Sequence, residues 1–165
     1  MPTLKDILDS PLRSRENNDC AVVATAVVLN ITYEDAHTLL RKNGRRTRCG
    51  TRVSISRAAL ESRAKVIEHA IGSPMSFFSH PNRPTAAQYL RKLPKTGRYW
   101  LASTTHAFAY VDGELRDNIT GGKMRARMHR CFEIVLPDAA VKPAPVSEFA
   151  PGEIAALMAR LDKLG

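Results

Sequence analysis

The feature that most constrains this chain is a nearly continuous apolar run that begins at a single cysteine. The polar segment 17–19 leads into Cys20, and among the ten residues that follow only Thr25 and the closing Asn30 are polar. A helix without a polar face must be surrounded by other parts of the protein. The run therefore predicts a central, buried helix over residues 20–30.

The place of the cysteine within this run predicts a reactive thiol. A short side-chain oxygen from Asn18 or Asp19 can cap a helix, which puts Cys20 in its first turn. The helix dipole there favours negative charge and lowers the pKa of a thiol. The alternative is a buried strand with a structural cysteine, because valine suits sheets and periodicity cannot separate the two structures in a short apolar run.

A second segment, residues 97–118, supplies a histidine and a carboxylate. Asp112-Gly113 lies between two apolar runs and predicts a two-residue hairpin turn. In that register His106 and Asp117 are diagonal neighbours on one face, and Asn118 points to the other face unless a bulge intervenes. A histidine beside a carboxylate is the orienting half of a catalytic triad. The alternative is an ordinary surface histidine at a strand start.

Several motifs together carry a resemblance to a known family. They are Asn18-Asp19-Cys20 at the start of the apolar run, Thr32-Tyr33-Glu34-Asp35-Ala36-His37, Gly44-Arg45-Arg46 with Gly50-Thr51, Gly97-Arg98-Tyr99-Trp100, and His106-Ala107-Phe108-Ala109-Tyr110-Val111-Asp112-Gly113 with Asp117. Over roughly residues 12–120 the chain resembles small papain-like cysteine-peptidase-fold proteins of bacteria and their phages. This resemblance implies a protein encoded by a phage or prophage.

The resemblance also implies a fold and a catalytic site. The fold is α+β and papain-like, with an N-terminal helical half whose central, cysteine-bearing helix packs on a small antiparallel sheet. Cys20 takes the position of the nucleophile, His106 that of the base and Asp117 that of the orienting residue. The expected site needs no cofactor.

The position of the oxyanion donor departs from the papain pattern. Papain-like enzymes carry a glutamine several residues before the cysteine, whereas this chain has Ser14 and Arg15 there. Asn17 or Asn18 could substitute, because a side-chain amide can donate a hydrogen bond to a developing oxyanion.

Composition indicates a cytoplasmic protein of one main domain. A length of 165 residues, 44% hydrophobic and 25% charged, is typical of a globular domain. No segment approaches the roughly 18 apolar residues that span a bilayer, and no secretory signal is apparent. The three cysteines are far apart and odd in number, and no spacing suggests a disulfide framework or a metal site. If the protein is phage encoded, the expected location is the host cytoplasm or the virion.

A basic segment dominates the charge of the chain, whose formal net charge is +9. It contains Arg41, Lys42, Arg45, Arg46, Arg48 and Arg52. Such a segment can bind an acidic partner or a phosphate backbone, or it can be a solvated loop. No aromatic residue lies within it, which argues against base stacking and predicts at most weak, non-specific binding of nucleic acid. Cys49 lies in this segment without a nearby base.

The order of predicted elements divides the chain into three parts. Residues 1–136 form the papain-like domain, with helices at 3–9, 20–30, 32–43, 54–64 and 85–92 and strands at 65–71, 98–103, 106–111, 114–118 and 131–136. Four prolines make residues 137–151 a semi-rigid linker. Residues 152–165 have helical apolar spacing, and this helix either packs back on the domain or docks on another chain.

Two classes of function remain open, and acyl transfer to an amine is a further possibility that would use the same residues as the first. The first is a cysteine peptidase or a related amide or thioester hydrolase that acts on a protein or peptide through Cys20, His106 and Asp117. The second is a catalytically inactive binding protein on the same fold, which contacts nucleic acid or a host protein through its basic surfaces. Convergence of the three residues beside an open cleft would favour the first.

Overall fold

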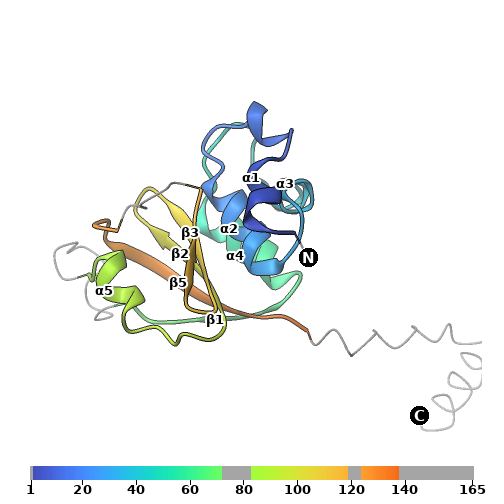
Figure 1. Cartoon of the computed structure of the whole chain (residues 1–165). Coiled ribbons are helices and arrows are strands. Elements are labelled where there is room, and N and C mark those ends of the chain that lie inside the picture. Colours follow the sequence, from blue (N-terminus) through green and yellow to red (C-terminus); the bar gives the residue numbers. More distant parts are fainter. Residues whose placement is uncertain (1, 72–82, 119–123, 138–165) are drawn as a thin grey trace, which may run out of the picture.

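Residues 2–71, 83–118 and 124–137 are described by a computed structural model, in which helices cover both faces of an antiparallel sheet (Figure 1). The fold is therefore α+β, as the sequence predicts. The described helices are α1 (Leu4–Leu8), the 3-10 turn η1 (Arg13–Arg15), α2 (Cys20–Leu29), α3 (Tyr33–Lys42), α4 (Val53–Glu61) and α5 (Ala86–Leu90). The described strands are β1 (Lys65–Glu68), β2 (Arg98–Ser103), β3 (Ala107–Val111), β4 (Glu114–Arg116) and β5 (Met128–Val135).

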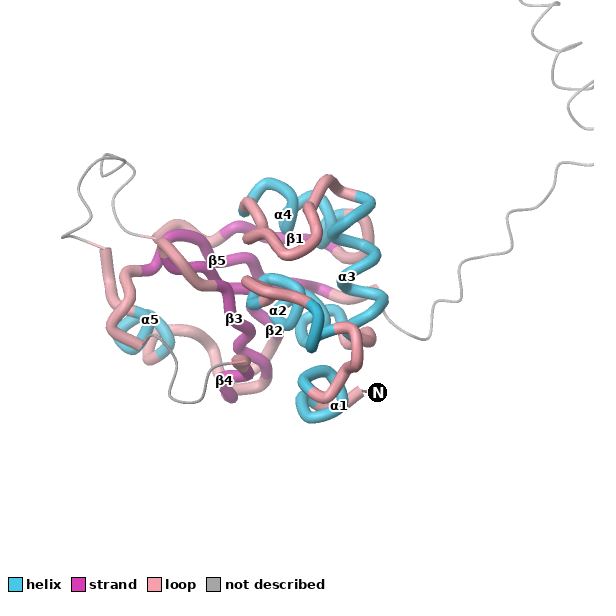
Figure 2. Tube along the Cα trace, turned by 90° about the horizontal axis from the view of Figure 1, so that it is seen from above, coloured by secondary structure: helices cyan, strands magenta, loops and turns pink. Residues whose placement is uncertain are grey.

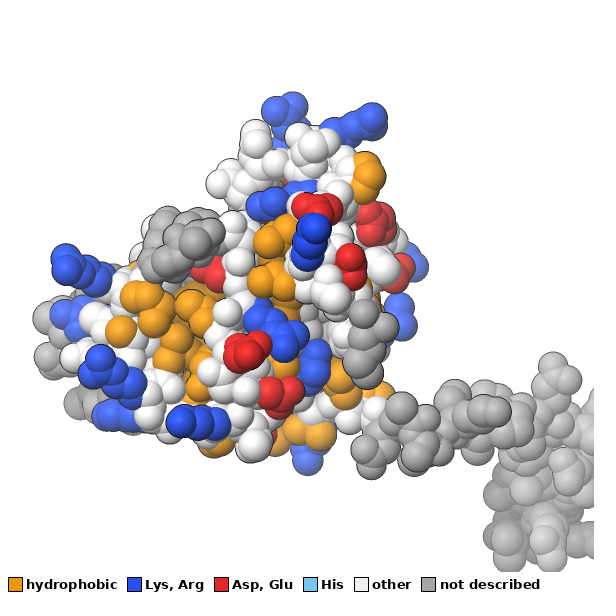
Figure 3. Space-filling model, viewed as in Figure 1, with side chains coloured by type: hydrophobic (Ala, Val, Ile, Leu, Met, Phe, Trp, Pro, Cys, Tyr) orange, Lys and Arg blue, Asp and Glu red, His pale blue; other side chains and the backbone are white. Residues whose placement is uncertain are grey.

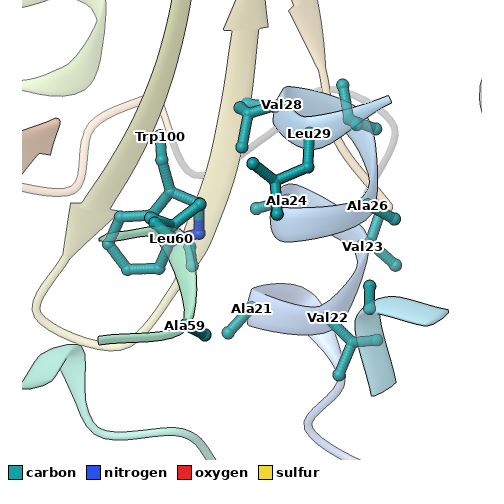
Figure 4. Close-up of a cluster of buried hydrophobic side chains, with 14 of the residues drawn as sticks. Ala21, Val22, Val23, Ala24, Ala26, Val28, Leu29, Ala59, Leu60 and Trp100 are labelled. Carbon is teal, nitrogen blue, oxygen red and sulfur yellow. The ribbon is translucent and has the colours of Figure 1, made fainter. Parts of the chain in front are cut away.

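The apolar run forms helix α2, and the alternative of a buried strand is wrong. Every residue of α2 after Cys20 is buried. Figure 4 shows Ala21, Ala24 and Val28 on the side of the helix that faces Trp100, while Val22 and Val23 point away from that ring. Burial on all sides outweighs the modest helix propensity of valine.

Two sets of hydrogen bonds cap the C-terminal end of α2. Asn30 adopts the left-handed conformation (φ 56°, ψ 45°), and its N–H donates to carbonyls of the last turn. The guanidinium of Arg98 on β2 donates to the carbonyls of Val27 and Val28 at 2.8 and 2.7 Å. These bonds tie the helix to the sheet and satisfy carbonyls that have no partner within the helix.

The strands pair antiparallel in the order β1-β5-β2-β3-β4. The predicted hairpin register is confirmed, because Val111 pairs with Glu114. Asp112 and Gly113 both have positive φ angles (50° and 85°), as a tight two-residue turn between twisted strands requires. This turn sets which residues at the far ends of β3 and β4 lie beside one another.

Alternating side chains of the sheet build two apolar layers. Figure 2 shows α2 and α5 on opposite sides of the strands. Trp100 and Ala109 belong to the larger core, which α2 and its neighbouring helices complete. Leu101, Phe108 and Cys131 point to the opposite face, where α5 covers them. The larger layer positions α2, and thereby Cys20, against the end of β3.

Threonine side chains cap three of the described helices. Thr3, Thr32 and Thr85 accept hydrogen bonds from the first turns of α1, α3 and α5. The helix expected at 54–64 begins one residue earlier, at Val53, without a side-chain cap. Ser56 lies buried within that helix.

The linker predicted at 137–151 and the helix predicted at 152–165 lie outside the described residues, apart from Pro137. Within the described ranges, no helix is long and apolar enough to cross a bilayer.

Candidate active site

Three elements bring Cys20, His106 and Asp117 together. Cys20 is the first residue of α2, His106 directly precedes β3, and Asp117 directly follows β4. Both carboxylate oxygens of Asp117 lie 2.8 Å from Nε2 of His106. The side chains of His106 and Asp117 are only 3% and 5% exposed.

The thiol of Cys20 occupies the other side of the imidazole. It forms a hydrogen bond with the His106 ring. Because Asp117 engages Nε2, the ring nitrogen left for Cys20 is Nδ1. Cys20, His106 and Asp117 thus form one hydrogen-bonded series, with the imidazole in the middle.

The environment of this group favours a charged pair. Burial raises the pKa of Cys20, but hydrogen bonds from His106 and from the Ala107 N–H outweigh burial, and the net pKa is lowered. Burial lowers the pKa of His106, but its hydrogen bonds with Asp117 and Cys20 dominate and raise it to about 9. Both shifts favour a thiolate beside an imidazolium over the neutral pair.

Asp19 starts α2 in a different way from that expected. Its carbonyl accepts from the N–H groups of Val22 and Val23, but its side chain makes no cap. The buried carboxylate instead accepts hydrogen bonds from Arg13 Nε at 2.8 Å and the Tyr33 hydroxyl at 3.3 Å. The prediction of an Asp19 or Asn18 side-chain cap is therefore wrong, because these tertiary partners take the carboxylate oxygens.

Asn118 also differs from its prediction. Strand β4 ends at Arg116, so the alternation of faces does not continue to Asn118. Its side-chain amide donates to Asp19 Oδ1 at 3.1 Å, and its N–H donates to Asp117 Oδ1 at 2.7 Å. Asn118 thereby connects Asp117 to Asp19, the residue that precedes Cys20.

The two candidate oxyanion donors lie at different places. Asn17 and Asn18 are both exposed, but only Asn18 lines the cleft beside Cys20. Asn18 has a left-handed backbone (φ 55°), which turns the chain just before α2. The N–H of Cys20 itself precedes the first intrahelical bond and is a further candidate donor.

An open cleft of about 460 Å³ lies beside Cys20 and His106. One wall is the segment 50–53, the other is the segment 102–105, and Trp100 and His129 complete the lining. No motif in the sequence indicates that His129 belongs to the site. Its Nδ1 lies 2.6 Å from the guanidinium of Arg83, and only the long-range pairing of β5 with β2 brings it to the cleft.

The basic segment is only partly a surface feature. Arg41, Lys42, Arg46, Arg48 and Arg52 are exposed, whereas Arg45 is 4% exposed and does not belong to any surface patch. Arg45 pairs with the buried carboxylate of Glu16 at 2.9 Å, which also accepts from the Arg48 N–H at 2.9 Å. An arginine can be buried only with such a partner, and the partner lies far away in the sequence.

His37 lies away from the cleft and contacts Glu16. It is buried, and its Nε2 lies 3.0 Å from Glu16.

The other two cysteines lie in different environments. Burial raises the pKa of Cys131 to about 12, whereas Cys49 is exposed. Within the described residues, no group of three or more His, Cys, Asp and Glu side chains is placed to hold a metal ion.

Comparison with known proteins gives no matching family model, no matching curated protein and no matching solved structure. The function proposed below therefore rests on the geometry of the site.

Proposed function

We propose that this protein is a papain-like cysteine hydrolase, a peptidase or a related amide or thioester hydrolase. The observation that carries the proposal is the convergence of Cys20, His106 and Asp117 beside an open cleft. A nucleophile, a base and an orienting carboxylate in one hydrogen-bonded chain is the arrangement that acyl transfer requires.

The geometry supports a two-step reaction. The Cys20 thiolate attacks the substrate carbonyl carbon, and the resulting oxyanion accepts hydrogen bonds from the Cys20 N–H and the Asn18 amide. The His106 imidazolium gives its proton to the leaving amine or thiol as the tetrahedral intermediate collapses to a thioester. Neutral His106 then takes a proton from water, whose oxygen attacks the thioester and releases the acid and the thiolate.

Selective labelling of Cys20 tests this proposal. In a Cys49→Ser background, iodoacetamide at pH 6 should alkylate Cys20 much faster than Cys131, whose pKa is about 12. Peptide mass mapping after timed quenching reads the two sites separately. A His106→Gln variant should slow the labelling of Cys20 because the thiolate loses its cationic partner.

The outcome that contradicts the proposal is slow labelling of Cys20 at the rate of an ordinary thiol, in protein shown to be folded by circular dichroism. That result would favour a binding protein on the same fold. Loss of labelling in Cys20→Ser with retained far-ultraviolet spectrum is the matched control.

A further inference from the structure

We infer that the substrate carries an acidic side chain close to the scissile bond, and that Arg52 recognises it. This inference rests on the proposed function, because it concerns the charge of the same cleft. It names a substrate class, an acidic peptide segment, and one specificity-determining residue.

The charge lining the cleft is of one sign. Its lining includes the permanently charged Arg52 together with the histidines His106 and His129, and no aspartate or glutamate. Buried Arg83 lies directly behind His129, within 2.6 Å of its ring. This cleft attracts an anionic substrate group and repels a cationic one. Both effects favour an acidic substrate over a basic one.

The acidic residues nearest the nucleophile do not offset this charge. The carboxylate of Asp117 is engaged by His106, and that of Asp19 by Arg13 at 2.8 Å. Both carboxylates are buried away from solvent, with side chains 5% and 10% exposed. The charge on the open side of the cleft is therefore that of Arg52 and its basic neighbours.

Arg52 has no competing partner in the described part of the chain. Its guanidinium forms no hydrogen bond or ion pair there, whereas Arg13, Arg45 and Arg57 each hold a carboxylate. An exposed arginine that lines a cleft without an internal carboxylate is available to a ligand, and its planar guanidinium suits bidentate binding of a carboxylate.

The backbone of Arg52 is held firmly at the cleft wall. Its carbonyl accepts from the N–H groups of Ile55 and Ser56 at 3.1 and 3.2 Å, because it precedes the first turn of α4. The adjacent Thr51 hydroxyl accepts from Arg45 Nε at 3.1 Å, and Arg45 is in turn held by Glu16. A fixed attachment reduces the entropy lost when the side chain binds a ligand.

Paired covalent probes test the inference. Peptidyl vinyl sulfones extend on the acyl side of the scissile bond, and bromoacetyl peptides extend on the leaving side. Each series carries a single Glu or a single Gln at one of the three positions nearest the electrophile, in an otherwise alanine peptide. In the first series the thiolate adds to the vinyl β-carbon and a proton is taken up at the α-carbon; in the second it displaces bromide.

We expect the Glu probe to modify Cys20 about fivefold faster than the Gln probe at one or more of these positions, since an exposed ion pair contributes at most about that factor. Arg52→Gln should bring this ratio close to one, and Arg52→Glu should reverse it. Arg46→Gln is the matched control, because Arg46 is exposed on the same segment but does not line the cleft. The preference should also fall as salt is added.

The possible failures can be told apart. Rapid modification of Cys20 with equal rates for Glu and Gln probes, or a preference unchanged in Arg52→Gln, overturns the inference and leaves the proposed function standing. If neither the probes nor iodoacetamide modifies Cys20 faster than an ordinary thiol, the proposed function fails together with the inference.

Discussion

At the scale of single residues, the two hydrogen bonds of the His106 ring decide the charge state of the site. Asp117 holds one ring nitrogen, Cys20 holds the other, and the pKa of His106 is raised to about 9 while that of Cys20 is lowered. The two groups titrate as a coupled pair, so the apparent pKa values belong to the pair. Between those values the thiolate and imidazolium coexist.

The ultraviolet absorbance of the thiolate at ~240 nm tests this state. The difference between wild type and Cys20→Ser should show a thiolate at pH 7 that is lost on acidification. In His106→Gln the thiolate should appear only at higher pH, because its cationic partner is missing. A thiolate that forms at the same pH in both proteins would contradict the ion pair.

Hydrolysis of a model thioester should give a bell-shaped pH profile. Activity should rise on the acid side as Cys20 loses its proton, below the ordinary pKa of a thiol. It should fall as the pH passes about 9, because His106 then lacks the proton for the leaving group. Activity that continues to climb above pH 10 would indicate an ordinary hydroxide reaction.

In the proposed mechanism, Asp117 orients the imidazole of His106, and Asn118 contacts Asp117. Asp117→Ala should lower the rate of model thioester hydrolysis about 10²- to 10⁴-fold, because it releases the imidazole from its tautomer and orientation. Asn118→Ala should lower it by no more than about tenfold, because the side-chain hydrogen bond to Asp19 is lost while the backbone N–H at this position still donates to Asp117. Glu114→Ala, at an exposed position of the same hairpin, is the control and should leave the rate unchanged. A rate in Asn118→Ala equal to that of wild type would show that the side-chain hydrogen bond from Asn118 to Asp19 does not contribute to the site.

At the scale of elements, Glu16 joins three parts of the chain. Its carboxylate contacts His37 on α3 and Arg45 and the Arg48 N–H in the segment before α4. Its hydrogen bonds with Arg45, Arg48 and His37 outweigh the effect of burial and lower the pKa of Glu16. Glu16 thereby secures the segment that forms one wall of the cleft.

Removing Arg45 should destabilise the fold strongly. Arg45→Ala leaves a buried carboxylate without its main cationic partner, which costs about 3–5 kcal/mol of unfolding free energy. Arg46→Ala, at the next and exposed position, should change it by no more than about 0.5 kcal/mol. Urea denaturation at pH 7 measures both. Similar small losses in the two variants would show that Arg45 is not held as described.

At the scale of the whole molecule, a net charge of +9 favours contact with anionic polymers. Figure 3 shows Lys and Arg side chains in separate small groups over the visible face, with a few carboxylates among them. Because Arg45 is buried, the basic segment contributes fewer surface charges than its composition suggests. The surface therefore favours weak, non-specific association.

We expect nucleic-acid binding at low salt that largely disappears near about 0.15 M salt, through counterion release. Replacing Arg46 and Arg48 by Ser should weaken it and leave the labelling rate of Cys20 unchanged. Fluorescence anisotropy with single-stranded and duplex oligonucleotides should give similar affinities, since no aromatic side chain interrupts the basic segment. Tight binding at high salt would instead favour the binding-protein hypothesis.

The sequence by itself determined the features that depend on neighbours a few residues away. The first turn of α2 at Cys20 follows from where the apolar run begins, and the pairing of β3 with β4 follows from the Asp112-Gly113 turn. This register brings the two far ends of the hairpin side by side, where His106 directly precedes β3 and Asp117 directly follows β4. Each of these results depends on backbone geometry over one turn or one hairpin, which short-range patterns report.

Only the tertiary structure decided which polar groups found distant partners. Arg45 is buried because Glu16, 29 residues earlier, meets it, and Asn118 turns toward Asp19, which is 99 residues away. His129 reaches the cleft through the pairing of β5 with β2. Local sequence patterns do not predict these long-range contacts. A buried polar side chain forms its hydrogen bond with whichever complementary group the packing of the whole domain brings close enough.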